Sequence, residues 1–235
     1  MRLRGNILVL GAPTVIALWF IYGFALMYLT TEPGQFGIYW PRHQWLYAHV
    51  ASGIVAILSG PLQLWLGLNR RTAIFHQILG IIYVVAVGVS GTCAFYLAKH
   101  NDFGWVFGLG FGTMAFAWMI STAIATIAIC LRSVEQHREW VIRSYVLTFG
   151  FVTFRLTYTV LDILKKGNTV ERMGAAVWLG WTIPLFLTEA ILQGRKIFVK
   201  PVSAVQPQDA NAYNASTAQA AFDLQNSGSS YLHRP

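Results

Sequence analysis

Residues 75–97 read FHQILGIIYVVAVGVSGTCAFYL and contain no Asp, Glu, Lys or Arg. The run is continuously apolar and does not alternate apolar with polar residues, as a strand of a membrane β-barrel would. At about 1.5 Å per helical residue, it is long enough to cross the roughly 30 Å hydrocarbon core of a bilayer. Because lipid offers no hydrogen-bond partners, the backbone of such a run must satisfy its own polar groups. The stretch therefore predicts a transmembrane α-helix.

Five more apolar runs of similar length flank this stretch. They cover about Ile7–Leu29, Trp45–Leu68, Phe103–Leu131, Trp140–Leu164 and Gly174–Gln193. The chain of 235 residues has a mean hydropathy of +0.51, and 11% of its residues are charged, against about 25% in a soluble domain. We therefore expect an all-α, polytopic transmembrane helix bundle with six spans. This composition excludes a disordered chain and disfavours an ordinary soluble globule.

The Lys and Arg residues of the loops predict the orientation, because cytoplasmic loops carry an excess of them. One side carries Arg2, Arg4, Arg70, Arg71, Arg132, Arg138, Arg195, Lys196 and Lys200, and the other carries Arg42, Lys99, Lys165, Lys166 and Arg172. We therefore expect both termini in the cytoplasm. The net charge of +8 reflects this asymmetry, and no basic face with interleaved aromatic residues indicates a nucleic-acid partner.

The composition divides the chain near residue 200. We expect residues 1–200 to form the six-helix transmembrane domain, with its core bundle at about 45–164. From residue 201 to 235 the chain is rich in Ser, Ala, Gln, Asn and Gly. Such a segment has too few large apolar residues to form a core. It predicts a disordered cytoplasmic tail.

Small and polar residues mark the helix faces that pack against protein in a bilayer. Three spans carry such residues at the three- to four-residue spacing of one helical face. These are His49, Gly53, Ala56, Gly60 and Gln63 in the second span; His76, Gly80, Tyr83, Val87, Ser90 and Ala94 in the third; and Ser144, Thr148, Phe151, Arg155, Thr159 and Asp162 in the fifth. They predict a bundle around a partly polar interior. The glycines at 104, 108 and 112 form a double G-x-x-x-G motif, which indicates close packing and no particular function.

Ionisable residues within a span are candidates for function because burying them in lipid is costly. Arg155 lies deep in the fifth span, and Asp162 follows two turns later on the same face. Arg155 is either a ligand or substrate contact, or a structural arginine held by Asp162, Tyr158 or carbonyl groups. Arg143 and Glu189 have matching depths in the fifth and sixth spans. They form either a structural ion pair or, through Glu189, a proton-transfer site.

The histidines separate by depth into two groups. His76 and His137 belong to the cytoplasmic side, and His49 and His100 to the outer side. A bis-histidine haem needs two imidazoles at matching depth on facing helices, so either pair is a candidate for haem b. Histidines at helix ends also bond locally, which is the competing interpretation. A third alternative is a metal bound at the outer surface by His43, His49, His100 and Asp102.

Known catalytic signatures do not help to choose among these alternatives. The chain has no P-loop, no G-x-G-x-x-G between a strand and a helix, and none of the H-E-x-x-H, G-x-S-x-G and C-x-x-C motifs. The cytoplasmic run around His137 and Arg138 is dense in hydrogen-bonding groups. It could face lipid headgroups or an anionic ligand.

Several of these residues occur in motifs that resemble a family of predicted bacterial membrane proteins of unknown function. The resemblance rests on His49, on FHQILGIIY at 75–83 and on HREWVIRSY at 137–145. Family members typically show H-R-x-L-G-x-x-Y and H-R-x-W-M-x-R-S-Y, and this chain differs from those patterns at Gln77 and Val141. The resemblance covers about residues 45–162 and implies a bacterial cytoplasmic membrane. The family-typical positions it implies are His49, His76, His137, Arg138, Arg143 and Arg155.

Three classes of function remain open. The first is a redox protein that binds haem b or a quinone through intramembrane His and Arg residues. The second is a transporter or small-ligand-binding protein that uses Arg155, Asp162 and Glu189. The third is an accessory subunit whose Gly104–Gly112 face contacts a partner in a membrane complex. The sequence leaves open whether the chain is an enzyme.

Overall fold

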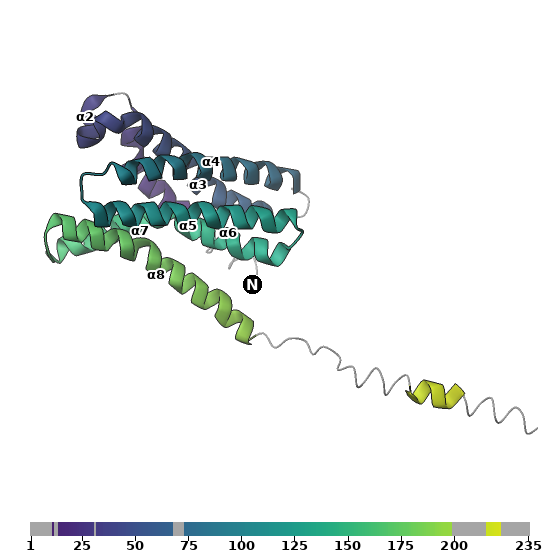
Figure 1. Cartoon of the computed structure of the whole chain (residues 1–235). Coiled ribbons are helices and arrows are strands. Elements are labelled where there is room, and N and C mark those ends of the chain that lie inside the picture. The colour runs from purple at the N-terminus through teal and green to yellow at the C-terminus, as the bar shows by residue number, and fades with distance from the viewer. Residues whose placement is uncertain (1–10, 12–13, 31, 68–72, 199–214, 222–235) are drawn as a thin grey trace, which may run out of the picture. The chain divides into compact units, whose positions relative to one another are not determined.

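The computed structural model describes residues 11, 14–30, 32–67, 73–198 and 215–221, and the regular elements in these ranges are all helices (Figure 1). The main helices are α3 (His43–Gly67), α4 (Ala73–Lys99), α5 (Trp105–Cys130), α6 (Val134–Thr148), α7 (Gly150–Ile163) and α8 (Thr169–Phe198). The prediction of an all-α, polytopic transmembrane bundle is confirmed.

Four of the described helices are long and apolar enough to cross a membrane. They cover Pro33–Gln63, Ile74–Lys99, Trp105–Cys130 and Thr169–Ile197. The consecutive helices α6 and α7 make a fifth crossing if they are taken as one bent span. These correspond to the second through sixth predicted spans.

The remaining predicted span, at Ile7–Leu29, is only partly described. Its described part is an apolar helix at Thr14–Tyr28, which we call the N-terminal helix. It contains a π-helical turn, η1 (Ile21–Ala25), and ends in a 3-10 turn, η2 (Leu26–Tyr28). Two short elements, α2 (Pro33–Phe36) and η3 (Gly37–Arg42), then lead into α3. The predicted start of the span at Ile7 lies outside the described residues.

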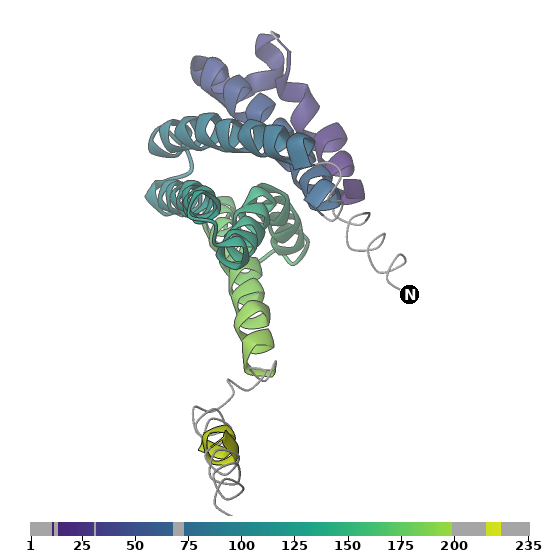
Figure 2. The same ribbon diagram turned by 90° about the vertical axis from the view of Figure 1, so that its right-hand side faces the viewer.

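The helices pack largely in chain order: α3 against α4, α4 against α5, and α5 against α6 (Figures 1 and 2). Short connections between long helices favour such antiparallel neighbours. At one contact in the core, the ring of Tyr145 from α6 lies over Gly60 of α3, in the space that a side chain would occupy. The small residues of the second span thus allow the close approach that their spacing predicts.

The interior and the exterior differ as expected for a protein in lipid. Fully buried positions hold small or polar side chains, among them Ala56, Ser90 and Ser144. Large apolar side chains face outward, such as Ile81 and Phe186, which are 66% and 72% exposed. Lipid solvates these side chains, whereas water would not. The chain is a membrane protein.

The G-x-x-x-G stretch is used for packing within the chain. A side chain at Gly108 would collide with the backbone oxygen of Ala98 and with Asn101. The glycine therefore allows the start of α5 to lie against the end of α4. This contact explains Gly108 without a partner protein.

The fifth predicted span, expected as one helix over Trp140–Leu164, is bent by 43° between α6 and α7. The bend lies at Phe149, the single residue between the two helices, whose backbone stays in the right-handed helical region with φ −79° and ψ −5°. Gly150 follows it, and a side chain there would meet the sulfur of Met114 at 2.6 Å. Glycine is a poor helix former and permits close approach. The bend therefore coincides with a close approach of this span to Met114 of α5.

Contacts divide the chain into residues 1–190 and 191–235. In the second unit, the structure describes the end of α8 and a short helix at 215–221. Residues 201–214 and 222–235 of the predicted tail lie outside the described residues. The disordered tail and its cytoplasmic location stay predictions.

Candidate functional site

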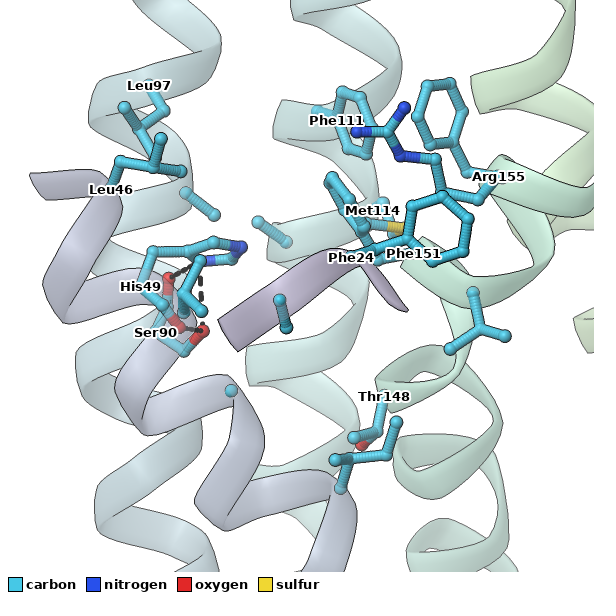
Figure 3. Close-up of a pocket in the computed structure, with 18 of the residues that line it drawn as sticks. Phe24, Leu46, His49, Ser90, Leu97, Phe111, Met114, Thr148, Phe151 and Arg155 are labelled. Carbon is cyan, nitrogen blue, oxygen red and sulfur yellow. Dashed lines mark hydrogen bonds between the residues drawn. The ribbon is translucent and has the colours of Figure 1, made fainter. Parts of the chain in front are cut away.

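A cavity of about 200 Å³ lies inside the first unit, between the N-terminal helix and helices α3, α4, α5 and α7 (Figure 3). Most of its lining is apolar. The polar side chains that reach it are Tyr28, Tyr39, His49, Ser90, Asn101, Trp118, Thr148 and Arg155. The two strongest hydrogen-bonding groups, His49 and Arg155, come from opposite sides, α3 and α7 (Figure 3).

Aromatic rings form the wall between these two polar groups. Phe151 stacks on Phe111 at 5.4 Å between ring centroids, and Phe154 meets Phe111 edge-on at 5.1 Å. Phe151 also meets the imidazole of His49 at 6.4 Å and Phe20 of the N-terminal helix at 6.1 Å. Offset and edge-on ring contacts of this kind stabilise a rigid wall. The wall suits a flat, apolar ligand.

His49 is fixed in one tautomer by Ser90 on the neighbouring helix α4. The His49 Nδ1 atom lies 3.0 Å from both the backbone oxygen and the hydroxyl oxygen of Ser90. The Ser90 hydroxyl donates its own proton to the backbone oxygen of His49, at 3.1 Å. Both Ser90 oxygens therefore act as acceptors, so the His49 Nδ1 carries a proton. The neutral ring leaves a lone pair on Nε2, and Figure 3 shows this atom turned toward the cavity.

Arg155, at the other side of the cavity, has no carboxylate within ion-pair distance in the part of the chain that the structure describes. Its Nε atom is buried and has no hydrogen-bond partner within the described residues. The nearest ring contact places the guanidinium 5.6 Å from the centre of Phe24, in the N-terminal helix. A buried charge of this kind needs a counter-charge or hydrogen-bond acceptors. The guanidinium is therefore available to a ligand in the cavity.

Asp162 is not the partner of Arg155. Its carboxylate lies 3.3 Å from the guanidinium of Arg172 and 3.5 Å from the amine of Lys165. Both cations lie at or beyond the loop between α7 and α8. The structural alternative for Arg155, an ion pair with Asp162, is thus not found among the described side chains.

A hydroxyl network closes the cavity next to Thr148. The Tyr83 hydroxyl lies 2.6 Å from the Ser144 hydroxyl and 2.9 Å from that of Thr148. Trp118 donates its indole N–H to Thr148 at 3.0 Å, and Thr122 lies 2.7 Å from Ser144. The network joins α4, α5 and α6. It satisfies the polar groups on this side of the cavity without a ligand.

Arg143 lies in a charged cluster apart from the cavity. Its guanidinium contacts Glu189 of α8 at 2.6 Å and Glu139, one turn earlier in α6, at 3.5 Å. The ring of Trp140 covers it at 4.7 Å. The ion pair between Arg143 and Glu189, one of the two alternatives from sequence, is present. Two carboxylates compensate this guanidinium, whereas none of the described carboxylates contacts Arg155.

The other histidine candidates do not line the cavity. His76 Nδ1 bonds to the backbone oxygen of Gln63 at 3.2 Å, and His137 Nδ1 to that of Ala125 at 2.8 Å. His100, just beyond the end of α4, bonds to the backbone oxygen of Tyr96 and, like Arg138, is exposed. Each of these three histidines thus has a backbone carbonyl partner, which is local for His100 and on the neighbouring helix for His76 and His137. No group of three His, Cys, Asp or Glu residues in the described ranges is arranged to hold a metal ion.

Sequence reasoning missed the residues that the N-terminal segments bring to the cavity. Phe20, Phe24 and Tyr28 come from the N-terminal helix, and Tyr39 from η3. The aromatic residues at 20 and 24, and at 107 and 111, stand four residues apart, which places each pair on one helical face. That spacing was the available signal for the aromatic wall.

One comparison with known proteins gave a match. Residues 46–192 match the model of a family described as "Predicted membrane protein (DUF2306)". The matched range contains His49, Arg155 and the Arg143 cluster, and it confirms the resemblance drawn from the sequence motifs. No curated protein and no solved structure matches the chain.

Proposed function

This chain belongs to the DUF2306 family of predicted membrane proteins, and we propose that it binds the headgroup of a lipophilic quinone within the membrane. The observation that carries the proposal is the placement of two groups across an aromatic cavity: the Arg155 guanidinium, which has no carboxylate partner among the described residues, and the lone pair of His49 Nε2. The family description names a location and no reaction, so the proposal rests on the cavity.

The size and lining of the cavity favour a single-ring or double-ring headgroup. About 200 Å³ is below the roughly 300–1,000 Å³ of pockets for drug-sized ligands, so a porphyrin is a poorer match. Stacked phenylalanines suit a flat ring, and Arg155 donates hydrogen bonds to an oxygen on that ring. The apolar tail of such a molecule would remain in the lipid.

Haem b has less support than a quinone. A bis-histidine haem needs two imidazoles facing one space, whereas His49 is the sole histidine of the described residues that lines the cavity. The second predicted pair, His76 and His137, has its Nδ1 atoms bonded to carbonyls of two different helices, α3 and α5.

A transporter or small-ligand-binding function could still use Arg155, but the other two residues proposed for it, Asp162 and Glu189, are engaged in ion pairs. Asp162 is engaged by Arg172 and Lys165, and Glu189 by Arg143. A ligand path through all three residues would therefore have to break existing ion pairs. The accessory-subunit function is inferred from the G-x-x-x-G motif. Gly108 of that motif packs within the chain, so it gives no support for a partner protein.

The orientation is part of the same proposal. The excess of Lys and Arg at the loops that include Arg70, Arg71, Arg132 and Arg138 supports a cytoplasmic location for both termini. The family resemblance supports a bacterial cytoplasmic membrane. In this orientation the cavity, which lies among the ends of α4 and the starts of α5, is in the outer half of the bilayer.

Photolabelling with an azido-substituted quinone tests the proposal. Protein in lipid nanodiscs is irradiated with the probe, and the labelled peptides are mapped by mass spectrometry. We expect labelling near Phe24, Phe111 and Phe151, reduced about tenfold in Arg155→Gln, because a charge-assisted hydrogen bond is lost. The exposed guanidinium of Arg132 provides a matched control, Arg132→Gln, which should label like the wild type. Labelling confined to lipid-facing peptides, or unchanged in Arg155→Gln, would refute the proposal.

A further inference from the structure

Two polar groups on opposite sides of the cavity, His49 and Arg155, differ in what they can offer a ligand. Arg155 has only N–H donors, whereas the neutral His49 ring offers only the lone pair of Nε2, because its proton is held on Nδ1 by Ser90. A matching ligand therefore accepts a hydrogen bond at one end and donates one at the other. This asymmetry follows from the hydrogen-bond network around Ser90, not from the identity of the residues alone.

Three other polar groups of the cavity lining already donate to protein acceptors. The Ser90 hydroxyl donates to the backbone of His49 at 3.1 Å, and the Trp118 indole donates to Thr148 at 3.0 Å. Thr148 in turn donates to the backbone oxygen of Ser144 at 3.0 Å. These three groups have no proton to spare for a ligand oxygen. At His49 and its neighbour Ser90, the cavity therefore offers a ligand an acceptor and no donor.

We propose that the cavity prefers the reduced, hydroquinone form of its ligand over the oxidised quinone. This inference rests on the proposed function, because it assumes a ligand of the quinone class. A hydroquinone donates one hydroxyl proton to His49 Nε2 and accepts from Arg155 at its other oxygen. A quinone has two carbonyl oxygens, so one of them would face the lone pair of Nε2. An unmatched polar contact of this kind in a buried site weakens binding.

Isothermal titration calorimetry tests the preference. Wild-type protein in nanodiscs is titrated anaerobically with a decyl-substituted benzoquinone and, separately, with its hydroquinone, and empty nanodiscs correct for partition into lipid. We expect the hydroquinone to bind about tenfold more tightly. Equal or tighter binding of the quinone would overturn the inference and leave the proposed function standing. Absence of binding by both forms would overturn the two together.

Variants at His49 then test which group makes the distinction. In His49→Gln the side-chain amide offers both a donor and an acceptor, so we expect the two affinities to come within about twofold of each other. His43→Gln is the matched control, because His43 lies in the same helix, stacks on Trp40 and does not line the cavity. It should keep the tenfold preference. A preference that persists in His49→Gln would also overturn the inference.

A redox-inactive pair of ligands gives an independent measurement on the unaltered protein. 4-Decylphenol carries a hydroxyl donor, and its methyl ether lacks it. We expect the phenol to bind more tightly in wild-type protein, whatever the folding of the variants. Equal affinities would overturn the inference.

Discussion

The two arginines of the fifth span have opposite environments. Arg143, in α6, is held by Glu189 and Glu139 and covered by Trp140. Arg155, in α7, faces a cavity with its buried Nε unpartnered in the described structure. The same residue type within one span thus serves two purposes. A compensated guanidinium joins helices, whereas an uncompensated one is kept where a ligand can complete it.

The largest expected effect on stability comes from removing the compensated charge. Arg143→Gln leaves two carboxylates without their cation, so the free energy of unfolding should fall by about 3 kcal/mol, the low end for a broken buried pair, because Glu189 is partly exposed. The change in the free energy of unfolding is measured by titrating SDS into the protein in a nanodisc-compatible detergent. Arg155→Gln is the comparison, and it should lose no stability because no ion pair is broken. Equal losses in both variants would contradict the distinction between the two arginines.

The second largest effect tests whether close backbone packing, rather than an ion pair, holds α7 against α8. A side chain at Gly180 of α8 would come within 2.8 Å of the backbone of Phe154, the neighbour of Arg155. Gly180→Ala should therefore push α7 away and lower stability by about 2 kcal/mol. Gly88→Ala is the control, because a side chain there meets nothing within 4 Å and alanine favours a helix. The same SDS titration measures both. A stable Gly180→Ala variant would show that α7 does not depend on this contact.

The smallest effect comes from an exposed ion pair, which sets the lower end of the scale. Arg42 donates to Asp102 at 2.7 Å, and this hydrogen bond lowers the pKa of the Asp102 carboxyl below its ordinary value. A lowered pKa in the folded state stabilises the fold above the pKa of the unfolded chain, about 3.9, and this contribution is lost as the pH falls through the folded pKa.

Thermal unfolding between pH 3 and pH 7 measures this contribution. Asp102→Asn should unfold slightly earlier than the wild type at neutral pH, by the equivalent of less than about 1 kcal/mol. The difference should shrink toward the acidic end, as the pH falls below the pKa of the unfolded chain and toward the lowered pKa of the folded state. A gap that stays constant across the range would mean that the ion pair is not its cause.

Most of the fold could be predicted from the sequence, because the side chain at each position indicates whether that position faces lipid or protein. The apolar runs locate α3, α4, α5 and α8, and the small-residue spacing identifies faces such as the one with Gly60. Matching depth also anticipated the contact of Arg143 with Glu189. These features depend on local composition and on helix geometry.

What the sequence could not predict depends on contacts between distant segments. The bend at Phe149 occurs without a proline, where α5 approaches Gly150. Asp162 pairs with Arg172, a cation beyond its own span, and not with Arg155 on its own face. Two of the eight polar side chains that line the cavity, Tyr28 and Tyr39, come from segments before α3. Each of these depends on which distant segments of the chain lie side by side in the folded protein.

The Nδ1 atoms of three histidines act as cross-links between helices. His49 and His76 each bond a carbonyl across the α3 and α4 contact, and His137 bonds one of α5 from α6. Each ring uses its Nδ1 atom to join two helices and leaves its second nitrogen, Nε2, outside the cross-link. In His49 that second nitrogen faces the cavity, so the side chain that fastens α3 to α4 also determines which hydrogen bonds the cavity offers.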